Sequence, residues 1–290
     1  MGGTPEAGTG AAVTAEGLGV RGSHGWAFRG ADIAADPGAL IAVEGPSGSG
    51  RTSLLLTLTG RMRPTEGHGG VGGLRVPQQM ARIRRISALA HVPGVSELDP
   101  VLTIAEHLRE RALLRRRFAD SPRGLLRPRR ERAAASRAAI DTALTAAGLD
   151  LGTLPKGPRT AVRDLERLEA LRLSIALALI ARPRLLAVDD ADLKLSDADR
   201  ERAWALLREI AEDGTTVLAV CSQAPPGAVV VRTARTGAAE GDENGENGQN
   251  AGSDEKARRT RKADAPAAEG HEHDENEEGS ADALAETRRA

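Results

Sequence analysis

The sequence has few aromatic residues and almost no cysteine. Its 290 residues include two tryptophans, two phenylalanines, no tyrosine and one cysteine, Cys221. A single cysteine excludes an internal disulfide, which fits a reducing compartment. No apolar run approaches the roughly 18 residues of a membrane span, and the first residues lack the charged-then-apolar pattern of a signal peptide. We therefore expect a cytoplasmic protein, which can still lie against a membrane protein.

Charge is distributed unevenly along the chain. Residues 236–290 hold 15 acids and 7 bases, a net of −8, and since the whole chain carries −1, residues 1–235 carry +7. The acidic segment is rich in Gly, Asn, Glu and Asp and has too few apolar residues to form a core. We expect a disordered leader over residues 1–14, one α/β domain over residues 15–235 and a disordered charged tail over residues 236–290.

A glycine-rich turn connects an apolar run at residues 40–43 with a helix-like segment at residues 53–58. Glycines let the backbone turn tightly and direct N–H groups at phosphate oxygens, while the following helix presents the positive end of its dipole to the same anion. The spacing matches the phosphate-binding pattern G-x-x-x-x-G-K-[ST], with arginine in place of lysine. The predicted nucleotide-binding residues are Gly45, Pro46, Ser47, Gly48, Ser49, Gly50, Arg51, Thr52 and Ser53.

This loop and the turn after it resemble the nucleotide-binding subunit of an ABC (ATP-binding cassette) transporter. In that family the loop helix, called Walker A, runs into a G-x-x-x-P-x-x-G turn, which this chain has at residues 60–67. The resemblance covers about residues 15–232. It implies an α/β P-loop fold of ABC type, with a parallel-core sheet, an antiparallel β portion near the N-terminus and a helical subdomain at about residues 95–165. It also implies ATP and Mg²⁺ as ligands.

A second match resembles the family's Walker B strand, an apolar run that ends in a carboxylate. Residues 185–188 are apolar and are followed by Asp189 and Asp190. By this resemblance Asp189 holds Mg²⁺ together with the hydroxyl of Thr52. Asp190 takes the place of the glutamate that polarises the attacking water, but its side chain is one methylene shorter, so it is a weak candidate for the catalytic base.

Residues that the family uses for hydrolysis are replaced at five places. These are Gly94 for a magnesium-contacting glutamine, residues 165–169 (LERLE) for the Leu-Ser-Gly-Gly-Gln signature, Asp190 for glutamate, Ser196 in the dimer-contact segment, and Ser222 for a γ-phosphate-contacting histidine. Glutamates in the signature segment would repel the phosphate that this segment normally caps. Backbone amides and a cation are retained in the loop. The sequence therefore predicts nucleotide binding with weak or lost hydrolysis.

Two further candidate ligand sites have simpler competing interpretations. Trp26, or less favourably His24, is a candidate for stacking on the nucleotide base, although an aromatic residue on a strand is more often part of a core. Residues 271–274 (HEHD) are a candidate metal site, although a solvated acidic tail is the favoured interpretation.

Residues 109–137 hold 11 arginines and three acids, a net of +8. By resemblance they fall in the helical subdomain that faces the membrane partner. They predict either an ordinary solvated helix surface or contact with a partner or with anionic lipid, while nucleic acid is disfavoured because Phe118 is the only aromatic residue in the stretch.

Functions of different classes remain open. The first is an ATP-binding subunit that pairs as a homodimer or heterodimer and serves a polytopic, permease-like membrane protein, which would hold it on the inner face of the cell membrane. The alternatives are a stand-alone regulatory or binding module on the same fold, and an active transport ATPase whose substitutions are compensated.

The composition of the tail generates a first prediction. Deleting residues 236–290 should leave the melting temperature within a few degrees of that of the full chain, because a polar segment buries little apolar area. Differential scanning fluorimetry of the two proteins measures this, and a larger decrease would show that the tail docks on the domain.

Overall fold

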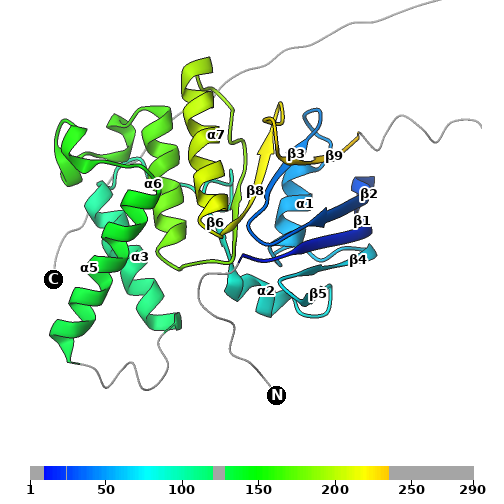
Figure 1. The fold of residues 1–290 in the computed structure, drawn as a ribbon, viewed down its shortest axis with the longest axis horizontal. Helices are drawn as coiled ribbons and strands as arrows, with labels where there is room; N and C mark the ends of the chain where they lie inside the picture. The colour runs from blue at the N-terminus through cyan, green and yellow to red at the C-terminus, as the bar shows by residue number, and fades with distance from the viewer. Residues whose placement is uncertain (1–9, 24, 120–127, 235–290) are drawn as a thin grey trace, which may run out of the picture. The chain divides into compact units, whose positions relative to one another are not determined.

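The computed structural model describes residues 10–23, 25–119 and 128–234, which form two β-sheets and a set of helices (Figure 1). The predicted tail, His24 and residues 1–9 lie outside this part of the chain. Ordered structure begins before the predicted boundary at residue 15. Ala11 and Val13 are fully buried, and the first strand begins at Val13, so the expected disordered leader is too long.

The first sheet is antiparallel. It consists of β1 (Val13–Gly22), β2 (Gly25–Ala35), β4 (Glu66–Val71) and β5 (Leu74–Val76), in the order β2-β1-β4-β5. Buried residues alternate with exposed ones along parts of β1 and β2, which is the pattern of a sheet with one face on a core. This sheet is the antiparallel portion that the sequence predicts.

The second sheet is parallel. It consists of β3 (Leu40–Glu44), β6 (Ser87–Leu89), β7 (Leu185–Val188), β8 (Thr216–Cys221) and β9 (Val229–Arg232), in the order β6-β7-β8-β3-β9. Nearly every residue of β3, β7 and β8 is buried, as expected for parallel strands covered on both faces. Because these strands run in the same direction, the segments that follow them lie at one edge of the sheet.

Helix α1 (Arg51–Leu58) lies between the two sheets (Figure 1). Its buried residues Leu54, Leu55 and Leu58 belong to one core cluster with residues of β1 and β3. Helices α6 (Arg167–Leu179) and α7 (Asp197–Glu212) contribute to a second cluster with the parallel sheet. Helices α3 (Ile104–Ala119) and α5 (Arg129–Ala146) pack against α6. Helix α2 (Met80–Ile86) contacts β5 and β6.

Several element boundaries differ from the sequence pattern. The apolar periodicity predicts one helix over residues 162–181, but Val162–Asp164 is a separate 3₁₀ turn and α6 begins only at Arg167. The strand expected over residues 86–92 is reduced to β6, since Ile86 ends α2. None of the described helices is long and apolar enough to cross a membrane.

The packing of α6 generates a stability prediction. Ile175 is fully buried in the cluster between α6 and the parallel sheet, so Ile175→Ala should lower the free energy of unfolding by about 2 to 5 kcal/mol. Chemical denaturation measures this. Val230→Ala, at a strand position that is 39% exposed, is the control and should change the free energy of unfolding by less than about 1 kcal/mol.

Candidate nucleotide-binding site

The glycine-rich loop is held by backbone from other strands. Gly48 and Gly50 have φ values of 80° and 79°, in the left-handed region. A side chain at Gly50 would collide with the carbonyl oxygen of Ala27 on β2. The hydroxyl of Ser49 is fully buried and shares a hydrogen bond of 2.7 Å with the hydroxyl of Thr233, just after β9. The loop shape therefore depends on two strands distant in sequence.

The loop opens onto the N-terminus of α1. Gly50 is the N-cap residue and supplies no side-chain cap, and the first turn has no acidic residue. The first backbone N–H groups of a helix have no partner within the helix, so they remain available to an anion. This is the arrangement that the sequence predicts for a phosphate site.

Two oxygen-bearing side chains meet beside this helix start. The hydroxyl of Thr52 donates a hydrogen bond of 2.6 Å to Oδ2 of Asp189, which directly follows β7 and is 2% exposed. Burial raises the pKa of Asp189, and the hydrogen bond from Thr52 opposes that rise. Because ionising a buried carboxyl is unfavourable, a bound cation would stabilise its charged form.

This pair of residues fits Mg²⁺. A hydroxyl and a carboxylate are hard oxygen ligands, and Mg²⁺ takes few protein ligands, completing its shell with phosphate and water oxygens. In the described part of the chain, no group of three or more His, Cys, Asp or Glu side chains could hold a metal ion. Thr52 and Asp189 therefore form the metal corner of the candidate site.

Arg51 points toward the end of β8. Its Nη1 donates a hydrogen bond of 2.6 Å to the carbonyl oxygen of Cys221. A lysine ammonium at this position would be a compact charge, whereas the guanidinium is wide enough to bind a strand-end carbonyl. Burial raises the pKa of the Cys221 thiol to about 12, so this sulfur is protonated and unreactive.

His91 is a site residue that the sequence analysis missed. It follows β6 and is half-buried; its carbonyl oxygen accepts a hydrogen bond of 2.7 Å from the N–H of Asp189. Burial lowers the pKa of the imidazole, as does Arg167, while the charges of Asp190 and Asp189 raise it. The signal was its place at the end of an apolar run, next to a parallel strand that ends in carboxylates.

Gly94, which the sequence analysis placed at the magnesium-contacting position, lies further along the same loop. Its N–H donates to Oε1 of Glu97 at 2.8 Å. Asp190 has a left-handed φ of 48° and is half-buried. The residue of this loop whose side chain interacts with the two aspartates is therefore His91, and not a residue at position 94.

The segment that replaces the family signature caps its own helix. Glu166 is the N-cap of α6: its side chain accepts the N–H of Glu169, and the side chain of Glu169 accepts the N–H of Glu166 at 2.9 Å. Such a reciprocal capping box satisfies two amides that would otherwise be free at the helix start. Nη2 of Arg167 lies 3.4 Å from Nε2 of His91 in the same chain. The start of α6 is thus engaged within its own chain.

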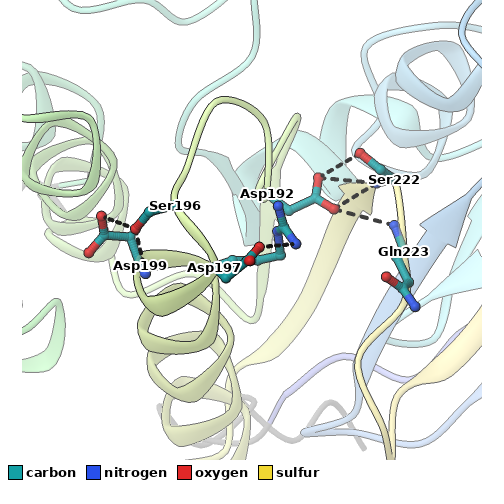
Figure 2. Close-up of polar contacts among 7 residues, drawn as sticks. Asp192, Ser196, Asp197, Asp199, Ser222 and Gln223 are labelled. Atoms are coloured by element: carbon teal, nitrogen blue, oxygen red, sulfur yellow. Dashed lines mark hydrogen bonds and ion pairs between the residues drawn. The ribbon is translucent and has the colours of Figure 1, made fainter.

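The end of β8 is held by Asp192, a second residue that the sequence analysis missed. Its carboxylate, 5% exposed, accepts hydrogen bonds from the N–H of Ser222 at 2.9 Å, from the Ser222 hydroxyl at 3.2 Å and from the N–H of Gln223 at 3.3 Å (Figure 2). The predicted switch residue Ser222 is therefore bound to a carboxylate of its own chain.

Ser196 has a local structural role. It is the N-cap of α7, where its hydroxyl accepts the N–H of Asp199 at 3.2 Å and donates to the Asp199 carboxylate at 2.7 Å (Figure 2). Ser196 followed three residues later by Asp199 is a sequence pattern that predicts a capped helix start, and the structure confirms it.

Trp26 lies half-buried on β2 with two arginines beside it. The guanidinium carbons of Arg29 and Arg21 lie 4.8 Å and 5.5 Å from the ring centroid, within cation–π range. A nucleotide base stacking on this ring would have to compete with these guanidinium groups. Base stacking by Trp26 stays a prediction.

The fold and site define a class of protein: an α/β domain with a phosphate loop and a metal corner at the edge of a parallel sheet is a P-loop nucleotide-binding domain. Comparison with known proteins identifies the family. Residues 28–192 match the family model described as ABC transporter, which is more than half of the chain. The chain therefore belongs to the ABC transporter family.

Its relatives include several ATP-binding proteins. The cytochrome c biogenesis ATP-binding export protein CcmA of Cupriavidus necator is 30% identical over 220 residues, 76% of this chain and 87% of that protein. The ribose import ATP-binding protein RbsA 1 of Rhizobium johnstonii is 27% identical over 205 residues, 70% of this chain. A putative ABC transporter ATP-binding protein of Streptomyces avermitilis is 32% identical over 206 residues, 70% of this chain. The chain spans 37% and 32% of the last two relatives.

Solved structures share the fold. The dimeric structure of MJ0796, a bacterial ABC transporter cassette, matches with a TM-score of 0.58 and 20% identity over 77% of this chain and 94% of that one. A post-hydrolysis dimer of the same cassette, bound to ADP and Pi, matches with a TM-score of 0.54 and 22% identity over 73% and 88%. The predicted fold class is confirmed.

The capping box generates a prediction. Glu169→Ala removes the side chain that caps the N–H of Glu166, so it should lower the free energy of unfolding by about 0.5 to 2 kcal/mol. Chemical denaturation measures the loss. Glu201→Ala removes an exposed glutamate from α7 and is the matched control. Equal effects of the two changes would contradict a capping role.

Proposed function

We propose that this chain is the ATP-binding subunit of an ABC transporter complex, and that it binds Mg-ATP with weak or lost hydrolysis. The observation that carries the proposal is the contact between Thr52 and Asp189 beside the uncapped start of α1. It brings the predicted magnesium ligands to the place where the loop amides would meet a phosphate. Names of the relatives, which include ATP-binding import and export proteins, support the same function.

Each part of the site would have a separate role in binding. Amides of the loop and of the α1 start would hold phosphate oxygens, and Thr52 with Asp189 would hold the ion. When bound, Mg²⁺ neutralises charge on the terminal phosphates. Arg51 would leave the Cys221 carbonyl and pair with phosphate, exchanging a neutral acceptor for a charged one.

Three observations support weak or lost hydrolysis. The Asp190 side chain is one methylene shorter than the glutamate that it replaces, and general-base catalysis depends on position. The amides of Glu166 and Glu169 at the start of α6 are bonded to carboxylates of the same helix. Ser222 is held by Asp192. Ground-state binding does not need these groups, whereas stabilising the transition state would.

A second candidate, an ATPase with sustained turnover, is favoured by His91. A half-buried imidazole with a lowered pKa is neutral near pH 7 and can accept a proton, and this one interacts with both Asp189 and Asp190. Measured phosphate release separates the two candidates. Co-purification with a polytopic membrane protein separates both from a stand-alone binding module.

A groove beside the site supports a membrane partner. It has a volume of about 370 Å³ and lies between the loop after β6 and helices α3 and α6. Its lining includes Leu98, Leu114 and Leu177 together with the acidic Glu97, Asp99 and Glu110. Val95 and Val101, 53% and 68% exposed, lie in the same loop region. The groove fits a partner segment that has both apolar and basic residues.

The groove and the metal corner are connected through one loop. Residues 92–99 connect His91 with the groove lining. A partner bound in the groove would therefore contact the same loop that accepts a hydrogen bond from Asp189 at His91. We propose that this partner is a permease-like membrane protein, which would hold the chain on the inner face of the cell membrane.

The proposal generates a binding prediction. Mg-ATP at about 100 times its dissociation constant should stabilise the protein by about 2 to 3 kcal/mol. Arg51→Ala should weaken binding about tenfold or more, because it removes a charged partner of the phosphates. Arg51→Lys is the matched control and should bind at least as well as the wild type. Thermal shift titration measures all three proteins, with phosphate release followed in parallel.

A variant of the proposed magnesium ligand Asp189 completes this experiment. Asp189→Asn keeps an acceptor for Thr52 but removes the charge, so it should abolish the magnesium-dependent part of the shift without lowering the melting temperature of the free protein. The proposal fails if millimolar Mg-ATP gives no shift with the wild type. Turnover of about 1 per second or faster would favour the ATPase candidate. Gly50 is unsuitable for this test, because any side chain there collides with Ala27.

A further inference from the structure

The described residues carry a basic surface that neither the nucleotide site nor the arginine stretch at residues 109–137 includes. Residues 61–85 hold six arginines and one acid, Glu66, a net of +5 with histidine neutral. All six arginines are exposed. We call them the α2 patch: Arg61, Arg63, Arg75, Arg82, Arg84 and Arg85.

Tertiary structure brings two of these arginines, one from each end of the segment, to the end of α1. Nη1 of Arg61 donates to the carbonyl oxygen of Thr59 at 2.7 Å and to Oγ of Ser87 at 3.1 Å. From α2, Nη1 of Arg84 donates to the carbonyl oxygen of Gly60 at 2.8 Å. These contacts use the negative end of the α1 dipole to hold two guanidinium groups side by side. Partial burial of the Arg61 guanidinium lowers its pKa to about 10, and the positive charges of Arg84 and Arg111 contribute to this shift.

No carboxylate compensates this charge within the described chain. None of the six arginines forms an ion pair with a described acid, and Glu66 is paired with Arg29 on β2 instead. Some other arginines do have acidic partners, such as Arg202 with Asp199. The patch thus concentrates six guanidinium groups within residues 61–85 without an ion pair to a described acid.

The position of the patch indicates its partner. Arg111 lines the groove described above, and its charge contributes to the lowered pKa of Arg61, so the part of the patch at Arg61 lies toward the groove. A membrane protein seated in the groove would bring this part of the patch toward the lipid surface. Met62, Leu74 and Met80 are half-buried among the arginines and offer apolar contact at a headgroup boundary.

We propose that the α2 patch binds anionic phospholipid headgroups. Planar guanidinium groups match phosphate oxygens in pairs, and basic side chains near an anionic bilayer each add to the attraction. Nucleic acid fits less well, because none of the described aromatic residues belongs to the patch and base stacking would have no platform. That the patch faces the bilayer rests on the proposed function beside a membrane protein. The positive charge of the patch is independent of that proposal.

Vesicle binding by the full chain tests the proposal. Wild-type protein should sediment with phosphatidylcholine vesicles that contain phosphatidylglycerol and not with phosphatidylcholine alone, and binding should weaken as salt rises. The triple variant Arg75→Glu, Arg82→Glu and Arg85→Glu should bind about 100-fold more weakly, since each basic residue contributes about fivefold. It spares Arg61 and Arg84, which hold the end of α1.

A control variant carries the same change of charge elsewhere. Arg159→Glu, Arg163→Glu and Arg182→Glu reverse three exposed arginines outside both the patch and residues 109–137, and should leave vesicle binding within about twofold of the wild type. Equal loss in the two variants would overturn the proposal in favour of general charge attraction. Equal binding to neutral vesicles would overturn it, as would full competition by millimolar inorganic phosphate or tighter binding to a DNA duplex.

The same samples separate this proposal from the proposed function. Both triple variants should keep the wild-type melting temperature and the full Mg-ATP shift, because none of their residues belongs to the nucleotide site. Loss of vesicle binding with an intact Mg-ATP shift in the patch variant supports the patch alone. If the wild type binds vesicles but Mg-ATP does not raise its melting temperature, the nucleotide proposal is rejected and the lipid-binding proposal is supported.

Discussion

The parallel pairing of β3 between β8 and β9 is the constraint on which the rest of the domain depends. It places Gly45, Ser222 and Thr233 at one edge of the sheet, and the pairing of β8 with β7 adds Asp189 to that edge. The α1 helix can then lie between the two sheets with its uncapped start beside a buried carboxylate. A shift of any of these strands by one residue would exchange its two faces and separate the groups that form the metal corner.

Carboxylates shape the rest of the site by bonding to their own chain. Asp192 holds the end of β8, and Glu166 with Glu169 closes the start of α6. Each contact satisfies amides that would otherwise be available to an incoming anion. The α1 start combines free amides with a nearby cationic side chain, Arg51, which is bonded to a neutral carbonyl. These contacts are the basis of our proposal that the site holds a phosphate in its ground state and hydrolyses it weakly or not at all.

Two surfaces of the domain differ in charge. The groove between the loop after β6 and helices α3 and α6 has an acidic and apolar lining, whereas the α2 patch, which lies toward it at Arg61, is basic. Such a boundary can orient a partner before close contact, because charge acts over about a Debye length. The loop that runs from His91 to the groove is joined to the metal corner by one hydrogen bond, from the N–H of Asp189 to the carbonyl oxygen of His91.

The sequence by itself determined the features that depend on neighbouring residues: the glycine-rich loop between β3 and α1, the buried strands, the capped start of α7 at Ser196, and the place of Asp189 directly after β7. Their patterns span fewer than about 20 residues, so local backbone physics specifies them. Only the tertiary structure decided that α6 begins at Arg167, that His91 accompanies Asp189, and that Asp192 holds Ser222. It also decided that Arg61 and Arg84 meet at the end of α1. These contacts join segments that lie far apart in the chain, and strand order rather than spacing brings them together.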